Sequence, residues 1–160
     1  MEAQNPAPVP SLFEWAGGMP AFEKLFNQFY DKVLADDILE PVFKHMSPQH
    51  REHVAHFVAE VFGGPKLYSE ADGSHFTMVQ KHLAKHLTQQ HRKRWIELLL
   101  ETADEQQLPD DPEFRSAFMA YLEWGTRIAV LNSNLDDVDM DANAPMPKWD
   151  WGVPGGPYLG

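Results

Sequence analysis

The chain has 160 residues, of which 43% are hydrophobic and 12% are aromatic, which is enough for one domain with a single core. Its formal net charge of -11 opposes binding to nucleic acid, because that binding depends on Lys and Arg that neutralise phosphates. No apolar run approaches the roughly 20 residues of a membrane span, so we expect a cytoplasmic protein without nucleic-acid or membrane partners.

The amino-terminal part of the domain follows a short extension. Residues 1–11 are rich in Pro and lack helical periodicity, so we expect them to be flexible. After Gly17 and Gly18, apolar residues repeat at helical spacing over residues 20–33, and Pro20 suits the first turn of a helix. This spacing predicts an amphipathic helix whose apolar face lies on the core.

The next helix has well-marked ends in the sequence. Ser47 is a favourable N-cap, and Gly63 ends the apolar repeat. Residues 66–77 show no such repeat, so we expect them to form a loop. A short helix after this loop is expected to carry both His82 and His86.

Two longer helices complete the predicted domain, residues 12–132. One carries Trp95 on its apolar face, and the other begins at Asp111, which is followed by Pro and Glu. No convincing alternation with a period of two occurs anywhere in the chain. The pattern therefore predicts an all-α fold.

The carboxyl-terminal extension, residues 133–160, is acidic and then rich in Pro and Gly. Its Trp149 and Trp151 are unusual in a free tail, because large exposed aromatic side chains usually mark a contact. The sequence leaves open whether this tail docks on its own domain or on a partner.

Eight His are the notable chemical feature, since the chain has no Cys and any metal must be held by His or carboxylate. The four-residue spacing of His82 and His86 would place both imidazoles on one face of a helix, where they could bind one zinc ion. However, the chain has neither the HExxH pattern of a catalytic zinc helix nor a second set of matched carboxylates for a di-iron bundle. The residues expected to be only exposed or hydrogen-bonded are His53, His56 and His91.

In order along the chain, several segments resemble those of the truncated haemoglobins, most of all the second group of that family. They are FEWAGGMPAFEKLFNQFYDKV, ILEPVF and FGGPKLYSEADGSHF, followed by KH and RKRW, and the agreement covers residues 13–132. The resemblance implies a truncated globin fold, a two-over-two helical sandwich around one haem b and its iron, with the two extensions added.

The resemblance also assigns roles to individual residues. His82 matches the proximal iron ligand; His86 is its rival, but it would bring Trp95 four residues too close for the family's interval. The residues expected to bind a diatomic ligand are Tyr30, Trp95 and His50, of which His50 is either a distal His, able to take the sixth iron position, or a solvated residue. The residues expected to contact the haem or its edge are Phe43, Val54, Trp95, Tyr68, His75 and Lys81.

One departure from the family follows the proximal His. The second group usually has a small residue, Pro and an aromatic residue there, whereas this chain has Leu83, Ala84 and Lys85. The geometry after His82 therefore does not follow from the resemblance.

The function that the resemblance implies is reversible binding of oxygen or another diatomic gas, such as nitric oxide or carbon monoxide, at a His-ligated iron. The alternatives are a haem-dependent redox enzyme, either a peroxidase or a nitric oxide dioxygenase, and a ligand sensor whose acidic tail binds a partner. We also expect a reductase of unknown identity to be a partner of this chain. The chain itself is expected to be a monomer or a homodimer.

Overall fold

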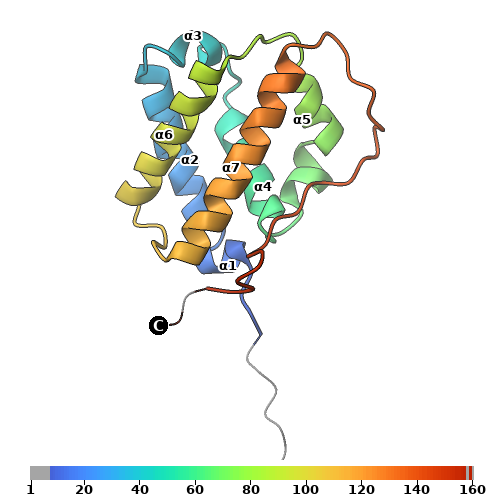
Figure 1. The fold of residues 1–160 in the computed structure, drawn as a ribbon. Helices are drawn as coiled ribbons and strands as arrows, with labels where there is room; N and C mark the ends of the chain where they lie inside the picture. Colours follow the sequence, from blue (N-terminus) through green and yellow to red (C-terminus); the bar gives the residue numbers. More distant parts are fainter. Residues whose placement is uncertain (1–7, 158, 160) are drawn as a thin grey trace, which may run out of the picture.

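A computed structural model describes residues 8–157 and residue 159 (Figure 1). The remaining parts of the two expected extensions, residues 1–7, 158 and 160, lie outside this description. Regular secondary structure in the described part is entirely helical, which confirms the all-α prediction. The elements are α1 (Leu12–Ala16), α2 (Met19–Ala35), α3 (Glu40–Phe43), α4 (His50–Val61), the π-helix η1 (Tyr68–Asp72), α5 (His75–His82), α6 (Gln89–Glu105) and α7 (Pro112–Ser133).

The four longer helices form two packed pairs. Helix α2 lies against α4 and α6, and α7 lies against α6 and α5, as Figure 1 shows. The core between the pairs is aromatic, because Phe22, Phe26 and Phe29 recur at helical spacing on one face of α2 and are fully buried. Burial of each such side chain stabilises the fold by about 1.5–3 kcal/mol. The expected two-over-two helical sandwich is confirmed.

The lipid bilayer sets a minimum length for a helix that crosses it. A spanning helix needs roughly 20 predominantly apolar residues. No helix within residues 8–157 combines that length with sufficient apolar character.

Asp111 connects the start of α7 to α1. One carboxylate oxygen accepts a hydrogen bond from the Phe114 backbone N–H at 3.0 Å and so caps α7, as the sequence predicts. The other accepts from the Trp15 indole at 2.8 Å. A single side chain therefore closes one helix end and fixes the position of another helix.

We expect Asp111→Ala to lower the free energy of unfolding by about 2 kcal/mol, the sum of a lost cap and a lost side-chain hydrogen bond. Urea denaturation followed by circular dichroism measures this change. Asp110→Ala removes the same charge from the exposed neighbouring residue and serves as the control. Equal losses of stability in the two variants would show that the contacts of Asp111 contribute nothing.

Two expectations about the region before α5 are wrong. Helix α4 begins at His50 rather than beside Ser47, because the Ser47 carbonyl accepts a tight-turn hydrogen bond from the His50 N–H at 3.1 Å. Residues 66–77 are not a plain loop, since they contain η1 and the first residues of α5. Local sequence signals do not report the tertiary contacts of these two elements, which join η1 to α4 and α5 to α7.

The expectation that one helix carries both His82 and His86 is also wrong. Helix α5 ends at His82, and His86 lies in the following loop with a φ of +54°. The cause is a tertiary contact, because the His86 N–H donates to the carbonyl of Ser133 at the end of α7, at 2.8 Å. The two rings therefore do not share a helix face.

The carboxyl-terminal tail docks on its own domain. Trp151 is only 6% exposed and lies edge to face with Trp15 and Phe114. Its indole N–H donates to the Pro10 carbonyl at 2.8 Å, and the Trp149 N–H donates to the carbonyl of Val61 at the end of α4, also at 2.8 Å. The alternative that the sequence left open is resolved in favour of intramolecular docking.

Candidate functional site

His82 is the last residue of α5, and the structure fixes its ring orientation. Its Nδ1 lies 2.8 Å from the Met78 carbonyl, one turn earlier, and must donate to it because a carbonyl only accepts. Burial lowers the pKa of His82, and the bond to Met78 opposes this shift without cancelling it. The ring is therefore neutral at neutral pH and its Nε2 keeps a lone pair, which is the form that ligates a metal.

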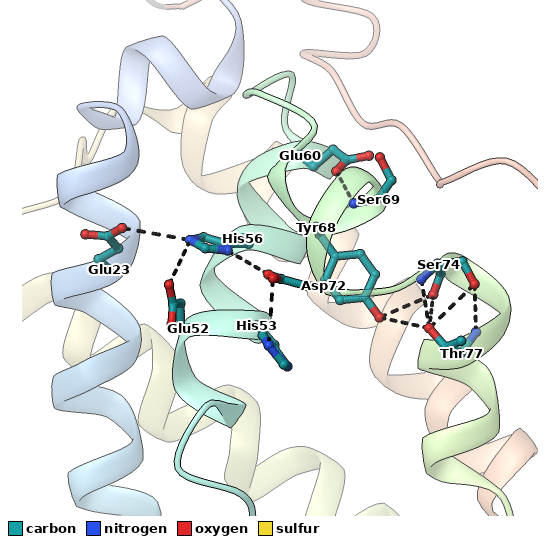
Figure 2. Close-up of polar contacts among 10 residues, drawn as sticks. All are labelled: Glu23, Glu52, His53, His56, Glu60, Tyr68, Ser69, Asp72, Ser74 and Thr77. Carbon is teal, nitrogen blue, oxygen red and sulfur yellow. Dashed lines mark hydrogen bonds and ion pairs between the residues drawn. The ribbon is translucent and has the colours of Figure 1, made fainter.

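Contacts between α4 and η1 hold the start of α5 (Figure 2). The His56 Nδ1 donates to the Asp72 carboxylate at 2.7 Å, which ties η1 to α4. Tyr68 is fully buried against Phe57, and its hydroxyl donates to the carbonyl of Ser74, the N-cap of α5, at 3.2 Å. These contacts set the position of the helix that carries His82.

Tyr30 lies on the core face of α2 and is 1% exposed. Its hydroxyl lies 3.1 Å from His50 Nε2, and its ring meets Phe43 edge to face with 5.8 Å between centroids. Burial raises the pKa of Tyr30, and the neighbouring Trp95 indole and Arg51 charge oppose this rise only weakly. The phenol is therefore protonated at neutral pH and able to donate a hydrogen bond.

His50 connects the two sides of the site. Burial lowers its pKa to about 4, and the positive charge of Lys81, with that of His82 whenever its ring is protonated, adds to the lowering. His50 is thus neutral at neutral pH, and Lys81 and His82 lie near enough to affect its protonation. The structure accordingly brings together residues from α2, α4 and α5 that are 52 positions apart at most along the chain.

The side chains around these groups fit a haem. Phe43, Val54, Met78 and Trp95 pack against the core yet remain partly exposed, so they offer apolar surface that a flat macrocycle can cover. His75 Nδ1 is buried and has no hydrogen-bond partner within the described residues. A propionate oxygen would satisfy this nitrogen, because burying an unpaired polar atom costs about 1–3 kcal/mol.

Two of the residues predicted to contact the haem, Tyr68 and Lys81, differ from the others in their surroundings. Tyr68 uses its hydroxyl to support Ser74, and Lys81 is exposed at the end of α5. Sequence reasoning missed Met78, whose carbonyl orients His82, although its four-residue spacing from His82 is a readable signal. It also missed the bond between His56 and Asp72, which joins separate elements and leaves no local signal.

The departure from the family after His82 has a structural explanation. Ala84 has a φ of +59°, in the left-handed region, and its N–H donates to the Leu135 carbonyl at 2.9 Å. Pro can do neither, since its ring fixes φ near -65° and it has no N–H.

Within residues 8–157, no three His, Asp or Glu side chains gather as a metal-binding group.

Comparison with known proteins places this arrangement among globins. The family model described as bacterial-like globin matches residues 11–126. A group 1 truncated hemoglobin of Nostoc sp. (strain MUN 8820) is 31% identical over 90 residues, which cover 48% of this chain and 75% of that protein.

Solved structures agree with this. A truncated oxygen-avid haemoglobin from Bacillus subtilis is 25% identical with a TM-score of 0.67, and the match covers 76% of this chain and 99% of that one. The group II truncated hemoglobin from Bacillus anthracis is 23% identical with a TM-score of 0.70, covering 82% and 97%, which shows a shared fold.

Proposed function

Because the chain belongs to the bacterial-like globin family and is a truncated haemoglobin with a haem b cofactor, we propose that it binds oxygen reversibly at an iron held by His82. The observation that carries this proposal is the neutral His82 ring, which Met78 orients so that Nε2 is free to bind a metal. The haem, when bound, supplies the ferrous iron at which a diatomic gas binds. The similar Bacillus subtilis protein, described as oxygen-avid, supports oxygen as the ligand.

The remaining pocket residues hold the macrocycle in this proposal. Phe43, Val54 and Trp95 cover its faces, together with Met78. His75 and the exposed Lys81 pair with its propionates, where charge-assisted hydrogen bonds are favourable. Tyr68 acts through Ser74, by fixing the start of α5 rather than by touching the reacting atoms.

Tyr30, His50 and Trp95 control the gas ligand. A protonated Tyr30 and a neutral His50 share one hydrogen bond, and its direction decides what Tyr30 can do. When His50 Nε2–H donates to the phenol oxygen, the phenol proton is left for the gas ligand; in the other tautomer that proton goes to His50. We assign the first tautomer to the gas-bound protein. In it the His50 N–H donates to the Tyr30 oxygen and the Tyr30 O–H donates to the gas ligand, which favours a ligand that gains negative charge.

We expect Tyr30→Phe to speed oxygen dissociation by about 10- to 100-fold, because a hydrogen bond to a charged group contributes about 1.5–3 kcal/mol. Stopped-flow replacement of oxygen by carbon monoxide measures the rate. Tyr121→Phe removes the same hydroxyl from a buried Tyr on α7 and serves as the control. Unchanged rates in both Tyr30→Phe and Trp95→Phe would refute the role of these two donors.

The test of the proposed function is the visible absorption spectrum of the purified chain with haem, in ferric, ferrous and carbon monoxide forms. We expect one haem per chain, a spectrum typical of His ligation, and repeated oxygen binding and release. The ferrous spectrum also shows whether His50 takes the sixth position at rest. Failure to bind stoichiometric haem would refute the proposal.

The pair of Tyr30 and His50 also favours a second function, a peroxidase. In the tautomer whose Nε2–H donates to Tyr30, the unprotonated Nδ1 of His50 can accept the proton of a peroxide, while the phenol donates to the outer oxygen of that peroxide. Peroxide turnover with a small phenolic reductant would then fall at least about tenfold in His50→Gln, since a positioned general base contributes 10²–10⁴-fold. Turnover no faster than that of free haem would exclude this function.

A further inference from the structure

Charge is strongly segregated along this acidic chain. Residues 73–96 contain five of the 13 Lys and Arg and four of the eight His, but none of the 24 Asp and Glu. The segment comprises α5, the loop after it and the first part of α6. One continuous stretch is therefore positive, although the whole chain carries a formal charge of -11.

Some of these basic side chains are unpaired and others form ion pairs. Arg92 is paired with Glu123 and Arg94 with Asp36, at 3.1 and 2.7 Å. By contrast, Lys81, Lys85, His86 and Lys93 are exposed, and none of them forms an ion pair with another described residue. We call Lys85, His86 and Lys93 the basic rim, since Lys81 pairs with a propionate in the proposed haem-bound protein.

The basic rim lies at one end of the molecule. In Figure 1 the loop between α5 and α6 crosses this end, beside the last turn of α7. The loop is fixed there by bonds from Ala84 N–H and His86 N–H to the carbonyls of Leu135 and Ser133. The rim is thus held by defined backbone contacts.

The protein's own acidic tail starts beside the rim but forms no ion pair with it. Its aspartates begin at Asp136, directly after Leu135, and no described Asp of the tail pairs with a lysine of the rim. The tail instead runs to the opposite end of the molecule, where Trp149 and Trp151 dock (Figure 1). A second copy related by a two-fold axis through the rim is a poor occupant too, because it would place the two rims, and so like charges, against each other.

We propose that the basic rim is the docking surface for an acidic electron-donor protein that returns ferric haem iron to the ferrous state. This inference rests on the proposed haem function. Lys81 and Lys85 flank His82, and covalent geometry keeps the Cα atoms of Lys85 and His82 within about 11 Å of each other. A protein bound to the rim therefore lies beside the proximal ligand.

Charge complementarity provides the recognition. An acidic surface is attracted to the rim and repelled by the rest of the chain, so the encounter is oriented toward the rim. The partner's reduced flavin or iron–sulfur centre gives up one electron, the ferric iron gains it, and no bond is formed or broken.

The test uses an acidic [2Fe–2S] ferredoxin as the probe and the haem-loaded chain. Isothermal titration calorimetry compares the wild type with Lys85→Glu/Lys93→Glu at low and at high ionic strength. The control is Lys24→Glu/Lys148→Glu, which makes the same change in net charge at exposed lysines outside the rim. We expect the rim variant to bind at least about tenfold more weakly at low salt, the control within about twofold of the wild type, and the difference to vanish at high salt.

The rate at which reduced ferredoxin reduces the ferric protein should fall in parallel with binding. Reduction by excess dithionite should reach the same ferrous spectrum in all variants, so a defect of the haem site is distinguishable from a defect of docking. Equal weakening in the rim and control variants, or no salt-dependent binding of the wild type, overturns the proposal. So does rim-dependent binding to phosphatidylglycerol vesicles in place of the ferredoxin, which would make the rim a membrane-contact surface.

Discussion

A His82→Ala variant is expected to lose its high affinity for haem, by at least about a hundredfold. The reason is that His82 is the imidazole whose Nδ1 is fixed by a carbonyl and whose Nε2 is left free, whereas loss of an outer partner alone typically costs 10–100-fold. Haem titration followed by absorbance measures the affinity, and circular dichroism verifies that the helices remain.

The matched control is His86→Ala, because His86 is exposed in the next loop and donates only through its backbone N–H. We expect that variant to bind haem normally. Added imidazole should restore the ferrous spectrum of His82→Ala, since the truncated side chain leaves room for a free ligand. Retention of the His-ligated spectrum in His82→Ala together with its loss in His86→Ala would reverse the assignment.

A Trp151→Ala variant should lower the free energy of unfolding by about 3–5 kcal/mol, as is usual when a buried Trp is truncated. The side chain is 6% exposed, contacts Trp15 and Phe114, and donates a hydrogen bond to Pro10. Urea unfolding of the haem-free chain, followed by circular dichroism, measures the loss without a contribution from haem binding.

Val153→Ala is the control for this prediction, because Val153 lies two residues later in the same tail and is fully exposed. Its free energy of unfolding should remain within about 0.5 kcal/mol of the wild type. A loss below about 1 kcal/mol in Trp151→Ala would show that the tail is only loosely attached to the domain.

The helices that the sequence predicts best are those with both local signals and a long apolar repeat. Asp111 and Pro112 mark the start of α7, and the Phe residues of α2 mark its buried face. The failures lie where tertiary hydrogen bonds decide the backbone. His86 is drawn out of a helix by Ser133, 47 positions away, and no local pattern contains that information.

For the candidate site, the sequence predicts where the residues lie but not which of them carry a proton. The spacing of His82 and Trp95 and the position of Tyr30 follow from the family's pattern, and the structure places Tyr30, Trp95 and His50 near one another. The proton states do not follow from the pattern. They depend on burial, which raises the pKa of Tyr30 and lowers that of His50, and burial is known only once the helices are packed.

The bond between Trp151 and Pro10 closes the polypeptide almost into a ring, with both described ends leaving from the face opposite the basic rim (Figure 1). A solid support or a fused protein attached through either end therefore leaves that rim facing the solution. Two copies joined in tandem by a short linker would likewise stand back to back, with their rims pointing outward and each accessible to its own electron donor.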